Sequence, residues 1–247
     1  MSKMKRIALL IDCDNVSHNS IEGVLDELAK YGMVNVRHAH GDWNNPSLSG
    51  WINRLHPHAI RPMQQFAYTK GKNATDSAMI IDAMDILYSE KVHGFCLVSS
   101  DSDFTRLATR LREAGMQVIG IGEKKTPNPF IVACDKFIYI EILKNQSKGA
   151  VSESEKTATK DSVDKITLKE IKLIATTIDD TSDDDGWAFL GDVGSLLQKK
   201  QTNFDPRNYG FQKLTPLIKS IGKFEIEQRE NPKSQHKLIF VKNQNRV

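Results

Sequence analysis

Two pairs of aspartates, each close behind an apolar run, are the residues of this chain whose types and spacing most clearly suggest chemistry. The run 7–11 is followed by Asp12 and Asp14, and the run 95–98 is followed, after two serines, by Asp101 and Asp103. Short runs rich in Ile, Leu and Val are typical of buried strands in a parallel sheet. Functional groups in such sheets gather beyond the carboxyl ends of the strands. We therefore expect these carboxylates to crowd into one small region.

Carboxylates this close repel one another unless protons are retained or a cation lies between them. Mg²⁺ and Mn²⁺ prefer such oxygen ligands. Asp76 opens a helical stretch that runs to about Tyr88 and adds a further acid. The pattern predicts a metal site for phosphodiester hydrolysis, formed by Asp12, Asp76, Asp101 and Asp103. Two structural alternatives stay open, because Asp76 suits the first turn of a helix and Asp103 suits a helix N-cap.

The elements that must position these acids alternate between strand and helix up to residue 143. Apolar runs predict strands at 7–11, 34–39, 59–63, 95–98, 116–121 and 137–142. Apolar residues at helical spacing lie between them, including a helix predicted over 104–113. This alternation is typical of an α/β fold with a parallel sheet covered on both faces. We assign residues 1–145 to this first domain.

The composition changes after residue 145. Residues 146–165 are rich in Ser, Thr, Lys and Glu and contain almost no large apolar side chains, which predicts a flexible linker. Helical apolar spacing returns from residue 166, and the alternating segments 224–227 and 237–241 predict a terminal hairpin. Three helices followed by a hairpin indicate a small winged-helix domain over residues 166–247.

The length and composition suit a globular protein of two small domains. The chain has 247 residues, of which 39% are hydrophobic and 26% charged. Its net charge of +3 is weak evidence for a nucleic-acid partner. No apolar stretch approaches the roughly 20 residues that span a bilayer, and the first apolar run is too short for a signal peptide. We expect a cytoplasmic protein without membrane contact, and we interpret its three cysteines as reduced core thiols.

Three motifs carry a resemblance to a known family. The segments 7–15, 71–76 with Asp82, and 98–104 resemble the NYN domain, which is similar to PIN-type nucleases, over about residues 5–143. The resemblance implies a Rossmann-like, PIN-type α/β/α sandwich and an Mg- or Mn-dependent ribonuclease of RNA processing or turnover. The catalytic residues it implies are Asp12, Asp76, Asp101, Asp103 and Asn15, with Asp82 as a helper.

The second domain resembles another known module. The segments 185–187, 190–194 and 204–210 look like the LOTUS domain, also called OST-HTH, over about residues 166–242. Members are winged-helix modules linked to RNA binding or to protein partners in RNA metabolism. The resemblance therefore implies RNA as a partner and leaves a protein partner open.

Basic side chains near both predicted sites are candidate ligands for RNA phosphates. These candidates are Lys72, Lys124, Lys125, Lys199, Lys200, Arg207 and Lys213. The alternative, an ordinary solvated surface, stays open for each of them.

Two other functions compete with the ribonuclease interpretation. Asp12 and Asp14 also fit the Asp-x-Asp of haloacid-dehalogenase-type phosphatases, in which Asp12 would be the nucleophile and Asp14 the general acid. The other rival is a non-catalytic RNA-binding or scaffold protein that keeps an inactive acidic cluster. We favour endonucleolytic cleavage, and the RNA substrate and a homodimer remain open.

Overall fold

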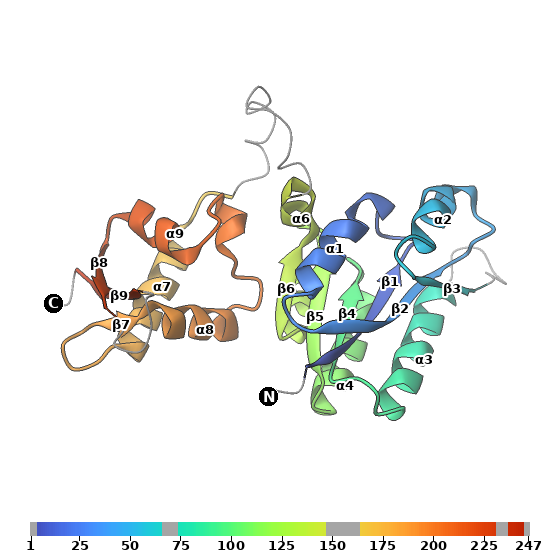
Figure 1. Cartoon of the computed structure of the whole chain (residues 1–247), viewed down its shortest axis with the longest axis horizontal. Helices are drawn as coiled ribbons and strands as arrows, with labels where there is room; N and C mark the ends of the chain where they lie inside the picture. The colour runs from blue at the N-terminus through green and yellow to red at the C-terminus, as the bar shows by residue number, and fades with distance from the viewer. Residues whose placement is uncertain (1–3, 66–73, 147–163, 231–236, 245–247) are drawn as a thin grey trace, which may run out of the picture. The chain divides into compact units, whose positions relative to one another are not determined.

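The computed structural model describes residues 4–65, 74–146, 164–230 and 237–244 (Figure 1). The chain divides into two compact units, residues 1–152 and 153–247. Asp164, near the end of the predicted linker, donates its backbone N–H to the carbonyl of Asn208 (2.9 Å) in the second unit. Among the described residues, no helix has the length and apolar character needed to cross a membrane.

The first unit is built on a six-stranded sheet in which every pairing is parallel. Its strands are β1 (Arg6–Asp12), β2 (Met33–Gly41), β3 (Arg61–Gln64), β4 (Gly94–Val98), β5 (Gln117–Gly122) and β6 (Lys136–Tyr139). Their order in the sheet is β3-β2-β1-β4-β5-β6. This is the doubly wound order, in which the chain first builds outward from β1 in one direction and then returns to build in the other. The predicted α/β fold with a parallel sheet is confirmed.

Helices cover both faces of this sheet (Figure 1). They are α1 (Ile21–Leu28), α2 (Ser49–Leu55), α3 (Ala74–Tyr88), α4 (Thr105–Glu113), α5 (Asn128–Ala133) and α6 (Ile140–Gln146). Alternate residues of β1 enter two separate cores. Ile7, Leu9 and Ile11 pack with α1, α2 and α6, whereas Ala8 and Leu10 pack with α3, α4 and α5. Because β1 is buried on both faces, its sequence is a continuous apolar run.

The prediction of a strand over residues 137–142 was wrong for residues 140–142. The strand β6 ends at Tyr139, and α6 begins at Ile140. Ile140 and Leu143 turn into the core beside α1, so the apolar run continues through the change from strand to helix. Apolar periodicity alone cannot separate the two structures over so few residues.

The second unit contains three α-helices and a small antiparallel sheet in its described part. The helices are α7 (Leu168–Thr181), α8 (Leu190–Lys200) and α9 (Leu214–Ile221). The strands β8 (Phe224–Arg229) and β9 (Leu238–Asn243) form the predicted hairpin, and β7 (Ala188–Phe189) pairs with β9. The two residues of β7 are too short a strand for any sequence pattern to indicate. The predicted small C-terminal domain is confirmed.

All three cysteines are free and buried, as the sequence predicts for core thiols. Burial raises the pKa of the Cys134 thiol to about 12 and that of Cys96 well above its ordinary value. These thiols therefore stay protonated and act as small apolar side chains.

We predict that Gly122→Ala destabilises the first unit by about 1–3 kcal/mol, the usual cost of overpacking a core. A Cβ at Gly122 would lie 2.5 Å from the carbonyl oxygen of Ser99 and 2.7 Å from Thr126 Oγ1. Urea unfolding monitored by circular dichroism measures the loss. As a control, Gly194→Ala places its Cβ 3.4 Å from its nearest neighbour, an ordinary contact. Equal stability of Gly122→Ala and the wild type would contradict the close packing of Gly122 against Ser99 and Thr126.

Candidate metal centre

The predicted site lies where the strand order reverses. The strands β1 and β4 are neighbours in the centre of the sheet, but the chain leaves β1 toward β2 and leaves β4 toward β5. The loops after β1 and β4 therefore diverge and leave an open crevice at the carboxyl ends of the two strands, where open α/β sheets bind ligands. Asp12 ends β1, and the segment from Ser99 to Asp103 follows β4.

Asp12 is fully buried and only partly satisfied. Its Oδ2 accepts hydrogen bonds from Asn15 Nδ2 (2.8 Å) and from Ser99 Oγ (2.8 Å). Its Oδ1 is also buried and has no hydrogen-bond donor among the described residues. Burial raises the pKa of Asp12, and the two hydrogen bonds oppose that rise. A buried carboxylate with an unpaired oxygen is costly, so an unpaired Oδ1 indicates a position at which a further ligand is favourable.

Three of the four predicted ligands form a close group, and Asp12 lies outside this group but near enough for its charge to act on Asp76. One carboxylate oxygen from each of Asp76, Asp101 and Asp103 lies within 4.8 Å of the others. Asp101 is the N-cap of a short 3-10 helix, η3 (Ser102–Phe104), because its Oδ1 accepts from the Asp103 N–H (2.9 Å). The capping role considered for Asp103 thus belongs to Asp101, and Asp103 lies in the first turn of η3.

Asp76, in the first turn of α3, experiences the crowding most strongly. Burial raises its pKa from 3.8 to about 6, with further increases caused by the charges of Asp12, Asp101, Asp103 and Asp14. All four neighbouring charges act in the same direction. The pKa of Asp76 is raised by burial and by these acids alone, so the centre is electrostatically unbalanced.

Asp82 and Asp14 each contact a neighbouring element of the first unit. Asp82 Oδ2 lies 2.7 Å from Nδ1 of His38 and 3.0 Å from Nε2 of His40, on β2. It therefore holds α3 against β2. Asp14 Oδ2 accepts a hydrogen bond from Thr75 Oγ1 (2.8 Å), which ties the loop after β1 to the start of α3.

Two pockets share Ser102 in the loop after β4. The larger, about 540 Å³, is lined by Asp76, Ser77, Ile80, Ser102, Asp103, Thr105, Arg106 and Pro129. The smaller, about 230 Å³, is lined by Asn15, Ser100, Asp101, Ser102, Lys125 and Pro127. Each pocket therefore joins members of the acidic cluster to one basic side chain. Sequence reasoning selected Lys125 and missed Arg106, because an arginine on a helix surface carries no signal of its own.

Several of the basic residues predicted to bind RNA already have partners within the protein. Lys72 lies outside the described residues. Lys124 donates its backbone N–H to Glu141 Oε1 (3.0 Å), and Lys125 Nζ lies 2.7 Å from Glu123 Oε2. In the second unit, Lys200 pairs with Asp180, and Arg207 forms a largely buried pair with Asp205 (2.6 Å). Lys199 and Lys213 are exposed.

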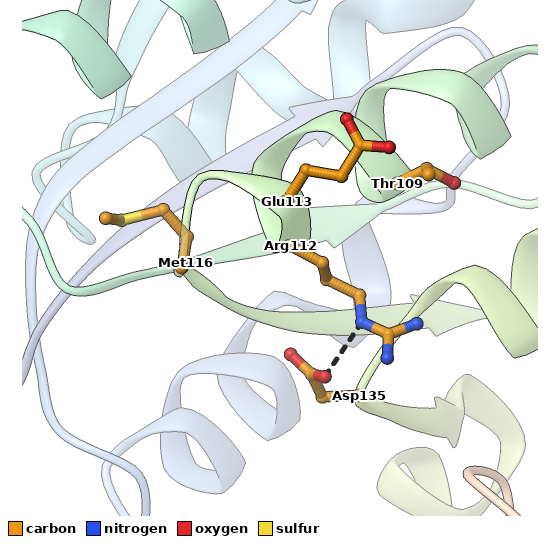
Figure 2. A pocket seen from close by; sticks show the side chains of 6 residues that line it. Thr109, Arg112, Glu113, Met116 and Asp135 are labelled. Atoms are coloured by element: carbon orange, nitrogen blue, oxygen red, sulfur yellow. Dashed lines mark ion pairs between the residues drawn. The ribbon is translucent and has the colours of Figure 1, made fainter.

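A further pocket, of about 440 Å³, lies away from the cluster of Asp76, Asp101 and Asp103 (Figure 2). It is formed at the end of α4 and the start of β5. It therefore lies at the amino ends of the strands, whereas Asp12 lies at the carboxyl end of β1. Its one basic side chain is already engaged, because Arg112 Nε lies 2.9 Å from Asp135 Oδ1 (Figure 2). We assign this pocket no catalytic role.

The acidic centre fits a hard divalent cation. Its donors are carboxylate oxygens, which Mg²⁺ and Mn²⁺ prefer. The unpaired Oδ1 of Asp12 and the raised pKa of Asp76 both indicate negative charge that the described residues leave uncompensated. One cation bound among these carboxylates would remove the repulsion that burial and neighbouring charges create.

Comparison with known families agrees with this geometry. The NYN domain model matches residues 6–141, which is more than half of the chain, so the protein belongs to the NYN domain family. The OST-HTH/LOTUS domain model matches residues 162–235. Both predicted resemblances are confirmed. NYN domains belong to the PIN-like nuclease superfamily and OST-HTH/LOTUS domains bind RNA, so the pair supports a ribonuclease or RNA-binding role.

Two solved structures are distantly similar to this chain. A protein of unknown function from Vibrio parahaemolyticus is 22% identical, with a TM-score of 0.48, and the match covers 57% of this chain and 95% of that one. An uncharacterized protein from Nitrosomonas europaea is 29% identical, with a TM-score of 0.32, over 40% of this chain and 93% of that one. No curated protein matches this chain.

We predict that Asp76→Asn stabilises the metal-free protein above pH 6. The folded state binds the Asp76 proton more tightly (pKa about 6) than the unfolded chain does (ordinary value 3.8), so ionisation opposes folding. The destabilisation by ionised Asp76 is absent below the pKa of the unfolded chain, 3.8, and complete above the pKa of the folded state, about 6. The advantage of Asp76→Asn should grow from near zero at pH 4 to on the order of 2 kcal/mol at pH 8.

Urea unfolding in EDTA at pH 4, 6 and 8 measures this difference. Added Mn²⁺ should shrink the advantage, because the cation stabilises the wild-type carboxylates. Asp26→Asn, at an exposed position on α1, is the matched control for the loss of one carboxylate. An advantage that is the same at pH 4 and pH 8 would refute the assigned crowding.

Proposed function

We propose that this protein is an Mg²⁺- or Mn²⁺-dependent ribonuclease that cuts RNA internally and acts in RNA processing or turnover. The observation that carries the proposal is the convergence of Asp76, Asp101 and Asp103, together with a nearby buried Asp12 whose Oδ1 has no donor among the described residues. Metal ions in such centres activate water for attack on phosphorus and stabilise the charge that develops on the phosphate oxygens. Asp12, Asp76, Asp101 and Asp103 are the residues that would hold the cation.

The remaining residues of the centre hold these carboxylates in place. Ser99 and Asn15 each donate a hydrogen bond to the same oxygen of Asp12, which leaves the other oxygen directed away from them and free to bind. Ser99 Oγ also accepts from the Asp101 N–H (3.1 Å), so one hydroxyl links the acids of both motifs. Fixed carboxylates lose little conformational entropy when a ligand binds, which favours affinity.

The layout of the two pockets supports internal cleavage. Both are lined by Ser102, and each contains at least one acid of the cluster, so an RNA strand that contacts both pockets passes the acids. Neither pocket requires the end of a chain. An exonuclease, in contrast, needs a site that recognises a terminal nucleotide.

The competing functions receive less support. The phosphatase alternative uses Asp12 as a nucleophile and Asp14 as a general acid, but it assigns no role to Asp76, on which the charges of both act. A non-catalytic RNA-binding protein gains nothing from mutually repelling carboxylates, although the family matches allow it. The two remaining possibilities differ in one observable, which is metal-dependent cleavage.

We predict that Asp101→Asn lowers cleavage of a labelled single-stranded RNA by at least about 100-fold, since even indirect partners of a metal ligand contribute 10–100-fold. Asparagine caps helices as well as aspartate does, so the cap on η3 and the fold should be retained. Gel analysis of RNA fragments at fixed Mn²⁺ gives the rate. Asp26→Asn is the control for loss of one carboxylate. Wild-type cleavage by Asp101→Asn would overturn the proposed centre.

The second unit, in this proposal, selects the RNA or a protein partner for the first. Lys199 and Lys213 are exposed and available to phosphates, whereas Lys200 and Arg207 already form ion pairs. A tethered second domain raises the effective concentration of a bound RNA near the catalytic unit. The proposal therefore assigns affinity to the second unit and chemistry to the first.

We predict that a fragment of residues 1–152 stays folded and cleaves RNA in a metal-dependent manner, but binds RNA more weakly than the full chain. The fragment keeps α6, whose Leu143 is buried in the core. The difference in affinity should shrink as salt rises, because phosphate contacts are the salt-sensitive part of binding. Fluorescence anisotropy at several salt concentrations measures it. Equal affinity of fragment and full chain would assign the second unit to a protein partner.

A further inference from the structure

Two histidines and one aspartate form a polar cluster between β2 and α3. His38 and His40 are two positions apart on β2, so their side chains leave the same face of the sheet. Asp82 Oδ2 lies 2.7 Å from His38 Nδ1 and 3.0 Å from His40 Nε2. The side chains of His40 and Asp82 are only 1% and 13% exposed, so water competes little for these contacts. Loss of one partner from such a buried cluster leaves the others unpaired, which is strongly unfavourable.

Apolar burial alone does not fix how α3 lies on the sheet. The buried apolar side chains of this helix are Met79, Ala83, Ile86 and Leu87. Each is followed by another apolar or aromatic residue, and these are Ile80, Met84, Leu87 and Tyr88. A helix turned by one residue, about 100°, would therefore present a second apolar face to the core. The opposite turn is disfavoured, because it would bury Asp85 in place of Ile86.

The turned position of α3 would remove one carboxylate from the metal centre. Asp76 lies in the first turn of the helix, about 9 Å along the axis from Asp82. A turn by one residue would place Ser77 at the position of Asp76, and Ala83 at the position of Asp82. Both histidines would then lose their acid, so the polar cluster favours the observed position of α3 over the turned one.

We propose that Asp82 and its two histidines fix the rotation of α3 on the sheet and so keep Asp76 in the metal centre. The inference rests on the proposed function and adds to it the residues that position one ligand of the cation. Asp82 is a positioning residue, because it acts on the centre through the helix. The hydrogen bond that Thr75 makes at the start of α3 is exposed, so water competes for it and it gives less support.

Mn²⁺ binding to the full-length protein tests the consequence for the centre, with free Mn²⁺ measured by electron paramagnetic resonance. We expect Asp82→Ala to raise the Mn²⁺ dissociation constant about 10- to 100-fold, the usual effect of losing a residue that orients metal ligands. Asp85→Ala, which removes an exposed acid of the same helix, is the control and should leave the constant near the wild-type value. An unchanged constant in Asp82→Ala overturns the inference.

A double-mutant cycle shows whether Asp82 acts through Asp76. If it does, Asp82→Ala should weaken Mn²⁺ binding far less in an Asp76→Asn background than in the wild type, because the affected ligand is already lost. Equal factors in the two backgrounds overturn the inference, since they would mean a general loss of structure. Asp82→Asn keeps an acceptor oxygen between the histidines and should recover part of the affinity. It also replaces Asp82→Ala in the cycle if that variant does not fold.

Thiol labelling in EDTA detects a turn of α3 without metal or RNA. Ile86 is buried, and a turn by one residue would move it to the exposed position of Asp85. We expect the thiol of Ile86→Cys to be protected from iodoacetamide, to react once Asp82→Ala is added, and to stay protected with Asp85→Ala. The native cysteines are buried and should stay unlabelled, which distinguishes a turned helix from an unfolded protein. Continued protection at position 86 in the Asp82→Ala protein overturns the inference.

The outcomes separate this inference from the proposed function. A wild type that binds Mn²⁺ but cleaves no RNA refutes the nuclease, while the binding and labelling results still decide the role of Asp82. A wild type that cleaves RNA, together with an unchanged Mn²⁺ affinity in Asp82→Ala, retains the nuclease and refutes the inference.

Discussion

Repulsion among carboxylates at the β1–β4 crevice is the constraint on which the rest of the first unit depends. The fold brings one carboxylate oxygen from each of Asp76, Asp101 and Asp103 within 4.8 Å of the others, and it buries Asp12 fully. Such a cluster lowers the stability of the folded state wherever all its members are ionised. The six-stranded sheet and its two covering layers of helices must therefore supply enough hydrophobic burial to hold the acids together. Sites that are unfavourable to folding in this way are commonly those that bind a ligand.

Small polar side chains fix the positions of the acids by hydrogen bonds. The Ser99 hydroxyl donates to Asp12 and accepts from the Asp101 backbone, so both acidic motifs depend on one residue. Ser99 is itself fixed from behind, because its N–H donates to the Ile121 carbonyl (3.0 Å) and its carbonyl lies against Gly122. The close approach of β5 explains why a residue without a side chain stands at position 122. Packing between strands thus determines the geometry of the metal centre.

The sequence predicted the parts of this structure that depend on local patterns. Continuous apolar runs identified the central strands, and the strand-end aspartates identified the acidic centre, because strand direction and side-chain type are enough for both. Features that depend on tertiary contacts were missed. The start of α6 at Ile140, the two-residue strand β7 and the partners of Asp82 follow from which elements meet in space. Arg106 became a candidate only through the pocket it shares with Asp76.

The two acids of α3 show why residue type alone could not assign roles. Asp82 is partly buried, which by itself would raise its pKa, but hydrogen bonds with His38 and His40 lower it strongly. Asp76, on the same helix, is partly buried among other acids, and its pKa rises to about 6. The charge of Asp82 is thus compensated within the protein, and this residue anchors α3 to β2. The charges that act on Asp76 are all negative, so its own charge is left uncompensated. An acid whose charge the fold already balances is structural, and one whose charge the fold leaves unbalanced is a candidate ligand.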